Sequence, residues 1–144
     1  MTTLRVLVAE DDDDHRYLTV RALRRTMQGS TEILEARDGE ETLDWLFGRG
    51  AHAHAAPPNL VFLDLQMPKA SGFDVLERLQ GHPELAAIPV IVVTSSRQRE
   101  DIDTAYALGS NSYVSKASGR RLVAHLQQVA EYWTRNSELP VITS

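Results

Sequence analysis

Three short apolar runs constrain the fold of this chain more than any other feature of its sequence. The runs are Leu4–Ala9, Leu60–Leu63 and Ile88–Val93, and none shows a regular alternation of apolar and polar residues. Because a strand with one wet face shows that alternation, these runs indicate strands that are buried on both sides. Such strands are typical of parallel sheets covered by helices on both faces. Two weaker segments, Glu32–Ala36 and Ser112–Ser115, are candidates for the remaining strands.

Segments with helical patterns separate the five candidate strands. Their apolar residues recur three and four positions apart, which is typical of helices that pack one face on a sheet. The predicted helices are Asp14–Met27, a segment from Asp38 to Gly48, a segment that begins near Ser71, Gln98–Leu108, and Ser118 to about Trp133. Asp38 and Glu41 have the spacing of a capping box, and Gly48 has the position of a helix C-cap.

The alternation of strand and helix, repeated five times, predicts an α/β fold with an open, doubly wound parallel sheet. Right-handed crossovers leave few arrangements of such a sheet, and we expect the strand order 2-1-3-4-5. The segment from Gly48 to Asn59 contains Ala, His and Pro and is predicted to be a surface loop. We interpret its histidines, His52 and His54, as solvated, and none of the other histidines has a partner at ligand spacing.

The charge and composition of the chain exclude several classes of function. Its 15 Lys and Arg residues are scattered through a chain of net charge -5, so no basic patch is available and direct binding to nucleic acid is not expected. The absence of cysteine excludes a disulfide framework, a thiolate zinc site and a cysteine nucleophile. The N-terminus has neither the flanks of a signal peptide nor the length of a membrane span, so we expect a cytoplasmic protein.

Acidic residues follow two of the predicted strands directly. Glu10 and Asp11 come after the first strand, and Asp64 comes after the third. In open α/β sheets the binding crevice lies at the carboxyl ends of the strands where the strand order reverses, so we expect these three carboxylates to converge. Carboxylates at close range repel unless one is protonated or a cation binds them. Magnesium is held by one or two carboxylates, waters and a substrate phosphate, so it suits this cleft.

Not every acid in this region needs a chemical role. Asp12, Asp13 and Asp14 stand where a helix begins, and acids are favoured there because they cap the helix and interact with its dipole. Asp64 differs, because Met67 and Pro68 follow it in a predicted sharp loop and no helix begins directly after it. We therefore interpret Asp64 as a residue placed for chemistry.

Five segments in a fixed order resemble the receiver domain of two-component response regulators, over nearly the whole chain. These segments are Val6–Asp11, Leu60–Pro68, Ser71–Phe73, Pro89–Thr94 and Tyr113–Lys116. The resemblance implies a flavodoxin-like (βα)5 fold, with a receiver domain in residues 1–135 and a C-terminal extension in residues 136–144. It also implies that the protein is a phosphoacceptor and no enzyme beyond its own phosphotransfer and slow autodephosphorylation.

The resemblance further implies roles for the residues at the acidic cleft. Asp64 is the expected phosphoacceptor, whose carboxylate attacks the phosphohistidine of a sensor histidine kinase. The expected ligands of Mg²⁺ are Glu10, Asp11, Asp64 and the backbone carbonyl of Gln66.

Three other positions carry the implied phosphoryl contacts and the switch. Lys116 and Thr94 are expected to contact the phosphoryl oxygens, the lysine as a point charge and the threonine through its hydroxyl. Movement of Thr94 and inward rotation of Tyr113 would then alter the surface formed by the fourth helix, the fifth strand and the fifth helix. Taken alone, each of these residues would be an ordinary surface or strand residue, and the resemblance depends on their order relative to Asp64.

Two positions depart from the pattern of the family. Ala117 stands after Lys116 where the family usually has proline, often with a cis bond. Because a non-proline cis bond costs about 3 kcal/mol, we expect a trans or strained bond there. Glu10 replaces the commoner aspartate, and its longer side chain predicts that it reaches the metal through a water. We also expect Gln66 and Ser96 to tune the lifetime of the phosphoryl group.

The tail after the last predicted helix, residues 136–144, gives a prediction about partners. Together with the Asp-rich start, it resembles single-domain regulators that partner bacterial phytochrome kinases. We expect a homodimer formed by the fifth helix and the tail, because exposed apolar groups tend to mark association surfaces. The alternative for Trp133 is packing against its own sheet.

Three other functions are considered. A haloacid-dehalogenase-like phosphatase also combines an aspartate nucleophile with magnesium, but it needs a second aspartate where this chain has Gln66. An EF-hand lacks support, because the acids at residues 11–14 are followed by neither the turn glycine nor the distant glutamate of that loop. A receiver-like scaffold that works without phosphorylation stays open, and the intact set of acids argues against it.

Overall fold

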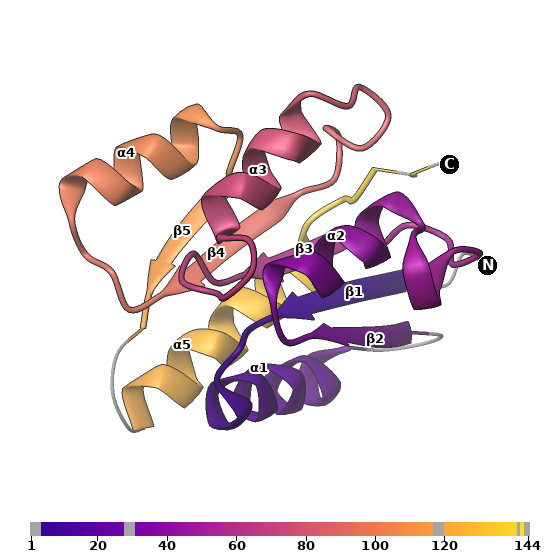
Figure 1. The fold of residues 1–144 in the computed structure, drawn as a ribbon. Coiled ribbons are helices and arrows are strands. Elements are labelled where there is room, and N and C mark those ends of the chain that lie inside the picture. The colour runs from indigo at the N-terminus through magenta and orange to yellow at the C-terminus, as the bar shows by residue number, and fades with distance from the viewer. Residues whose placement is uncertain (1–3, 28–30, 117–119, 141, 143–144) are drawn as a thin grey trace.

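The computed structural model describes residues 4–27, 31–116, 120–140 and 142, and these residues form a five-stranded sheet between two layers of helices (Figure 1). The strands are β1 (Leu4–Ala9), β2 (Thr31–Ala36), β3 (Leu60–Leu63), β4 (Val90–Thr94) and β5 (Ser112–Ser115). Their order is β2-β1-β3-β4-β5, and every pairing is parallel. The predicted fold class and strand order are therefore confirmed.

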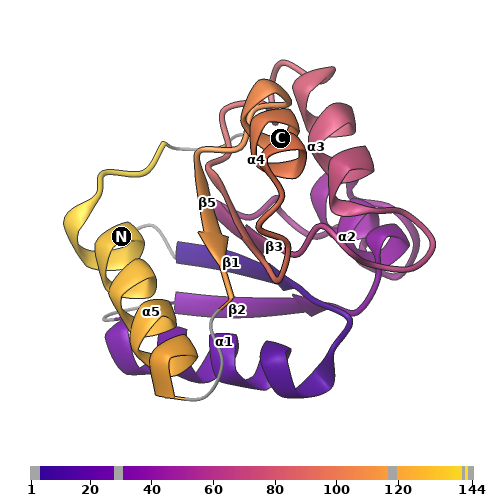
Figure 2. The same ribbon diagram turned by 90° about the vertical axis from the view of Figure 1, so that its left-hand side faces the viewer.

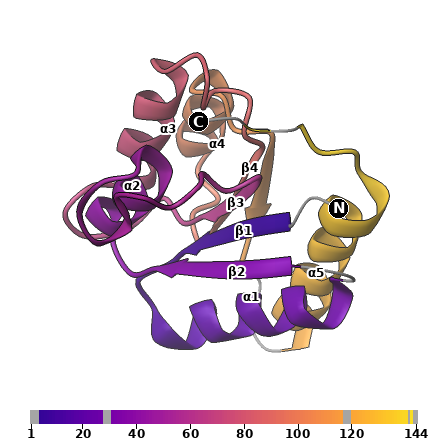
Figure 3. The ribbon, with the colours of Figure 1, turned by 90° about the vertical axis from the view of Figure 1, so that its right-hand side faces the viewer.

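The helices cover the two faces of the sheet unequally. They are α1 (Asp13–Thr26), α2 (Gly39–Phe47), α3 (Gly72–Gln80), α4 (Arg99–Ala107) and α5 (Arg120–Glu131), with a short 3-10 helix at Gly50–His52. Figures 2 and 3 show α1 and α5 together on one face and α2, α3 and α4 on the other. Each layer packs on its own apolar cluster. Among the described residues, no helix is long and apolar enough to span a membrane.

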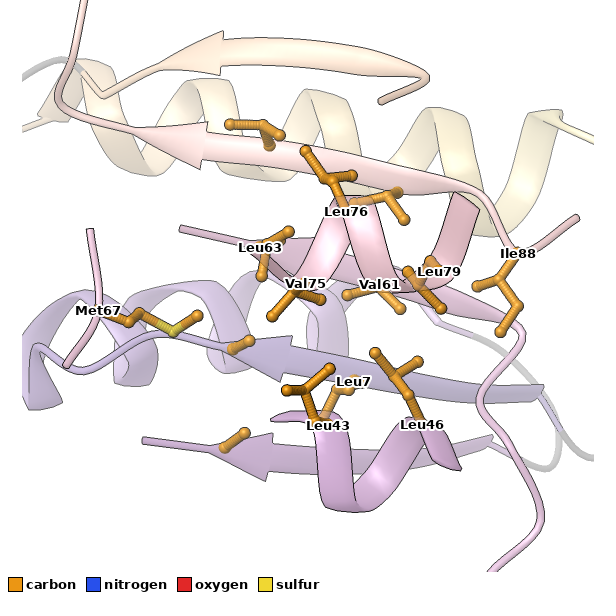
Figure 4. Close-up of a cluster of buried hydrophobic side chains, with 14 of the residues drawn as sticks. Leu7, Leu43, Leu46, Val61, Leu63, Met67, Val75, Leu76, Leu79 and Ile88 are labelled. Carbon is orange, nitrogen blue, oxygen red and sulfur yellow. The ribbon is translucent and has the colours of Figure 1, made fainter. Parts of the chain in front are cut away.

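The inner strands are buried on both faces, as their unbroken apolar runs predict. Val6 and Val8 of β1 point into the cluster beneath α1 and α5, whereas Leu7 points into the cluster beneath α2 and α3. Figure 4 shows the cluster beneath α2 and α3, in which Leu43 of α2 and Val75 of α3 approach the strands. This burial of apolar surface supplies the main favourable term for the fold and makes the sheet a rigid base for its loops.

Local capping explains where the helices begin. Asp12 is the N-cap of α1 and accepts a hydrogen bond from the N–H of His15, which confirms a capping role for this acid. Asp38 caps α2 by accepting from the N–H of Glu41, but the Glu41 carboxylate accepts from the N–H of Arg37, so the predicted box is not reciprocal. Gly48 ends α2 in the left-handed conformation, with φ 63°.

Several element boundaries differ from the predictions by one or two residues, among them the start of β4 and the end of α5. Strand β4 begins at Val90, two residues after Ile88, because Pro89 has no N–H for the ladder and contributes only its carbonyl, to Val61. Helix α5 ends at Glu131 and passes into a π-helical turn, Tyr132–Asn136. The predicted helix start at Ser118 and the peptide bond between Lys116 and Ala117 lie outside the described residues.

Trp133 and the described residues of the tail lie against the body of their own chain. Trp133 is half-buried and packs against the cluster beneath α1 and α5, as does Leu139. Ile142, three residues further on, packs against the cluster on the opposite face of the sheet. The tail therefore passes from one layer to the other, near the amino ends of the strands and away from their carboxyl ends (Figure 1).

Candidate functional site

The parallel sheet brings the predicted site residues to one edge. Glu10 follows β1, Asp64 follows β3, Thr94 is the last residue of β4 and Lys116 follows β5. Ala9 pairs with Leu63, and Thr94 pairs with Ser115. Because these pairs lie at the carboxyl ends of adjacent strands, the residues that follow them meet above the same edge of the sheet.

The three predicted carboxylates form a compact cluster. Glu10, Asp11 and Asp64 each place an oxygen so that these oxygens lie within 4.8 Å of one another. Glu10 and Asp64 are buried, whereas Asp11 is exposed. The predicted convergence of the three carboxylates is therefore confirmed. Two of these carboxylates are buried, and the third faces solvent.

Lys116 neutralises part of this negative charge. Its Nζ lies 2.5 Å from Oε1 of Glu10 and 3.0 Å from Oδ2 of Asp64. The lysine side chain is 7% exposed, so the ammonium group is bound to its two carboxylate partners where little water can replace them. Lys116 therefore lies at the acidic cleft, while its contact with phosphoryl oxygens stays a prediction.

Burial and close contact shift the pKa values of this triad in different directions. Burial raises the pKa of Glu10 to about 8, and its hydrogen bond with Asp64 acts in the same direction, against the attraction of Lys116. Burial also acts to raise the pKa of Asp64, but the hydrogen bond with Glu10 and the charge of Lys116 outweigh it and lower that pKa. Burial opposes the charge on Lys116, yet the two carboxylates outweigh it and raise its pKa. Without a metal, these shifts favour a proton on Glu10 and an ionised Asp64 near neutral pH.

The donor set suits a divalent cation. Three carboxylates face one ammonium group, and a cation between them would offset the burial and the repulsion from Asp64 that favour a proton on Glu10. Oxygen-only ligands of this kind favour magnesium, calcium or manganese over softer metals. The backbone N–H of Gln66 donates to Oδ1 of Asp64 at 3.1 Å, while the role of the Gln66 carbonyl as a metal ligand stays a prediction.

Thr94 has a hydroxyl group without a partner. Its residue is 0% exposed, and its Oγ1 makes no hydrogen bond to the described part of the chain. Buried polar atoms are nearly always paired, so an exception calls for an explanation. An additional group at this edge of the sheet, such as a phosphoryl oxygen, would provide the missing acceptor.

The loop after β3 approaches the site through a glycine. The N–H of Gly72 donates to the carbonyl of Leu65 at 2.9 Å. A Cβ atom at Gly72 would lie 2.4 Å from the backbone oxygen of Asp64, which is closer than real Cβ contacts allow. The absence of a side chain at Gly72 therefore permits α3 to begin directly beside the residue that carries the buried carboxylate.

His15 lies at the site, although the sequence gives it no partner at metal-ligand spacing. Its Nδ1 lies 3.0 Å from Nζ of Lys116, although 101 positions separate the two residues. The one signal in the sequence is the place of His15 in the first turn of a helix that follows an acidic loop.

His52 lies away from this site. The interpretation of His52 as solvated is wrong, because its half-buried ring stacks on Trp45 with centroids 3.4 Å apart.

Tyr113, the predicted switch residue, lies beside this site on β5. Its ring is half-buried against the cluster beneath α2 and α3, and its hydroxyl donates to the carbonyl of Ser96 at 2.9 Å. The hydroxyl of Ser96 in turn donates to Oδ2 of Asp101 at 2.6 Å. Tyr113 is thus hydrogen-bonded to the loop that follows Thr94. This bond is a candidate link between the acidic site and the surface around β5.

Comparisons with known proteins agree with this geometry. A model of the response regulator receiver domain matches residues 6–127. Response regulator Rcp1 of Synechocystis sp. is 31% identical over 136 residues, 94% of this chain and 92% of Rcp1. The structure of Mn²⁺-bound Rcp1 has a TM-score of 0.90 at 30% identity, covering 96% of this chain and 99% of that one. The phosphorylated cyanobacterial phytochrome response regulator RcpA has a TM-score of 0.91 at 30% identity, with 97% and 100% covered. The chain belongs to the response regulator receiver family.

Proposed function

We propose that this protein is a phosphoacceptor response regulator of a two-component system, which receives a phosphoryl group from a sensor histidine kinase on Asp64. The observation that carries the proposal is the contact of the buried, ionised Asp64 with Lys116, 3.0 Å away. The unpaired hydroxyl of Thr94 at the end of the adjacent strand supports it. A carboxylate held in this way is both available as a nucleophile and adjacent to positive charge.

The proposed transfer makes one bond and breaks one. A carboxylate oxygen of Asp64 bonds to phosphorus, while the bond between phosphorus and the imidazole nitrogen of the kinase breaks and that nitrogen keeps the electron pair. Negative charge on the phosphoryl oxygens is stabilised by the ammonium group of Lys116 and by the hydroxyl of Thr94. Catalysis by the chain consists mainly of positioning and charge compensation.

Mg²⁺ is the proposed cofactor, held by Glu10, Asp11, Asp64 and the backbone carbonyl of Gln66. When bound, it supplies positive charge that offsets repulsion between the carboxylates and the phosphoryl group. Rcp1 has a Mn²⁺-bound form, which supports a divalent cation as the cofactor of this chain, and Mg²⁺ is the proposed ion here. Glu10 contributes only after it loses the proton that burial retains on it.

Turnover as a phosphatase is not proposed. A phosphatase of the aspartate-nucleophile type needs a second acid to protonate its leaving group. Gln66 occupies the position where such an acid is required, and its side chain cannot serve as one. We propose instead that the phosphoryl group is lost slowly by hydrolysis, with Gln66 and Ser96 influencing its lifetime.

Mass spectrometry after incubation with acetyl phosphate and Mg²⁺ tests this proposal. The wild-type chain is expected to gain one phosphoryl group, and the Asp64→Asn variant is expected to gain none. Asp103→Asn, which removes an exposed acid of α4, is the matched control and is expected to react as the wild type does. An unmodified wild-type chain contradicts the proposal and favours the phosphorylation-independent scaffold. An equal adduct on Asp64→Asn also contradicts it, because the phosphoryl group would then be on another residue.

The proposed output is altered binding to another protein. Thr94 and Tyr113 are the proposed switch residues, because the Tyr113 hydroxyl is bonded to the loop that follows Thr94. The names of RcpA and of a red-light signalling regulator, RPA3017 of R. palustris at 30% identity, support a phytochrome as the kinase. The absence of cysteine fits the reducing cytoplasm, where we place the protein.

A homodimer through α5 and residues 136–144 is also proposed. Tyr132, directly after α5, is 55% exposed, and its ring lies at right angles to the ring of Trp133. Aromatic residues at the surface are enriched in protein interfaces, which supports this face as the dimer contact. Light scattering on a chain cut at Asn136 tests this proposal. If the truncated chain has the same oligomeric state as the full chain, the tail does not form the dimer contact.

A further inference from the structure

A nearly buried arginine lies beside the acidic cluster without belonging to it. Arg16, in the first turns of α1, binds three groups through three different nitrogens. Its Nη1 donates to the backbone carbonyl of Glu10 at 2.9 Å, its Nε to Oε1 of Glu35 at 3.1 Å, and its Nη2 to Oδ1 of Asp13 at 2.5 Å. The guanidinium group thus connects α1, the end of β2 and the loop that carries the cluster.

The two ion pairs do not explain why this arginine is buried. The Arg16 side chain is 8% exposed, whereas its partners Asp13 and Glu35 are 82% and 48% exposed. Pairs with solvent-exposed carboxylates contribute little to stability, typically under about 1 kcal/mol. The bond to the Glu10 carbonyl is the one in which both sides are buried.

That bond completes the fixation of the Glu10 backbone. The N–H of Glu10 donates to the carbonyl of Ala36 at 3.0 Å, and its carbonyl accepts from Arg16. Both backbone polar groups of Glu10 therefore have partners outside the loop. Its carboxylate has a further contact within the loop, because Oε2 accepts from the N–H of Asp12 at 3.2 Å. The loop cannot shift without breaking these bonds.

We propose that Arg16 is a positioning residue for the divalent-cation site: it holds the Glu10–Asp11 segment so that both carboxylates face Asp64. Arg16 acts through the backbone of Glu10 and has no role as a ligand. This inference rests on the proposed function, because it concerns the same cation. Groups that orient metal ligands typically change metal affinity by about 10- to 100-fold when they are removed.

Arg5 provides a matched control at the other end of the same strand. Like Arg16, it binds a glutamate of β2 and a backbone carbonyl: its Nη1 lies 2.7 Å from Oε2 of Glu32, and its Nη2 donates to the carbonyl of Ala56 at 2.9 Å. Its side chain is 19% exposed. Arg5 lies at the start of β1, whereas Glu10 follows the end of that strand, so loss of Arg5 removes similar bonds far from the acids.

Calorimetric titration with Mg²⁺ of the wild type, Arg16→Met, Arg16→Lys and Arg5→Met tests the proposal. We expect affinity to fall about tenfold in Arg16→Met and at least about threefold in Arg16→Lys, whose single amine cannot make three bonds. Affinity is expected to stay within twofold of wild type in Arg5→Met. Loss of a positive charge alone would strengthen cation binding, so a decrease identifies lost positioning.

Amide hydrogen exchange in EDTA gives a second readout that needs no metal. The amides of residues 10–12 are expected to exchange faster in the Arg16 variants than in the wild type or in Arg5→Met, because their loop has lost its anchor. If Arg16→Met does not fold, Arg16→Lys carries both measurements.

The outcomes separate the two claims. A wild-type chain that binds no Mg²⁺ contradicts the proposed function, while the exchange experiment still decides whether Arg16 anchors the loop. A wild type that binds Mg²⁺, with folded Arg16 variants of unchanged affinity and unchanged exchange, overturns the positioning role of Arg16.

Discussion

Nδ1 of His15 and Nζ of Lys116 lie 3.0 Å apart, which gives the buried lysine a third partner. An ammonium group has three donors, and those of Lys116 meet Glu10, Asp64 and His15. Since ammonium has no acceptor, Nδ1 must be the unprotonated ring nitrogen in this contact. The imidazole therefore helps to aim the lysine at the position where phosphoryl charge is expected.

Removal of this third partner should slow phosphorylation. In His15→Phe, one donor of Lys116 loses its acceptor, and a hydrogen bond worth about 1 kcal/mol corresponds to a rate about fivefold lower. His15→Gln keeps an acceptor and should react within about twofold of the wild type. The rate of adduct formation with acetyl phosphate at saturating Mg²⁺ measures both. Equal rates in His15→Phe and wild type would leave His15 as a bystander.

The stability of the metal-free protein should depend on the protonation of Glu10. Its pKa in the folded state is about 8, against an ordinary value of 4.5. The folded state therefore holds a proton that the unfolded state releases between these pH values. The contribution of Glu10 to stability is complete below pH 4.5, and it is lost as the pH rises toward 8.

Glu10→Gln, which cannot ionise, should remove this dependence. In EDTA at pH 8, its free energy of unfolding should exceed that of the wild type by more than about 1 kcal/mol, the equivalent of one pKa unit, and the difference should shrink toward pH 5. Added Mg²⁺ should stabilise the wild type far more than the variant. Urea unfolding measures each value, with Glu84→Gln as the control at an exposed acid. A difference that does not vary with pH would contradict the prediction.

Replacement of Thr94 by valine should raise stability and slow phosphorylation. Thr94→Val removes the buried hydroxyl that lacks a partner and keeps the shape of the side chain, so the free energy of unfolding should rise by about 1 kcal/mol. Phosphorylation should become at least about fivefold slower, because a donor to the phosphoryl group is lost. Thr94→Ser keeps the hydroxyl and serves as the control for rate. A variant that is less stable yet equally reactive would show that the hydroxyl has a structural partner.

Gly72→Ala should disturb the phosphoacceptor loop. The added Cβ would meet the Asp64 backbone oxygen at 2.4 Å and the Leu65 Cα at 2.7 Å, so the loop must move, at a cost of about 1–3 kcal/mol. Gly81→Ala is the matched control, because the nearest contacts of its Cβ are 3.7 Å away and its φ is -77°. We expect Gly81→Ala to be neutral or slightly stabilising. Thermal unfolding and phosphorylation rates of both variants check this, and a fully stable Gly72→Ala would refute the steric argument.

The strand layout and the position of the acids could be predicted because they depend on local rules. Unbroken apolar runs such as Leu60–Leu63 predict strands that are buried on both faces, and right-handed crossovers then restrict their order. Once that order is known, Glu10 and Asp64 must converge, since parallel strands end at one edge of the sheet. The resemblance to the receiver domain, and not this logic, implied that Thr94 and Lys116 lie beside them.

The contacts of individual side chains could not be predicted in this way. The sequence shows a histidine in the first turn of α1, but its distance from Lys116 depends on how α1 and β5 pack on the same sheet. The bond from Arg16 to the Glu10 carbonyl likewise requires a loop conformation that no spacing encodes. Packing of Leu139 and Ile142 on opposite faces is also a tertiary result, because apolar tail residues have no preferred partner in the sequence alone.

The amino-acid sequence by itself determined the family, the order of the strands and the edge at which Glu10, Asp11 and Asp64 meet, because hydrophobic periodicity and chain connectivity are properties of the linear chain. Only the tertiary structure decided which partner each buried polar group has. Burial favours a proton on Glu10, the Thr94 hydroxyl has no acceptor within the described part of the chain, and Nζ of Lys116 lies 3.0 Å from Nδ1 of His15. Such effects arise when charges from distant segments share a space with little water, where short distances and weak screening govern the interaction.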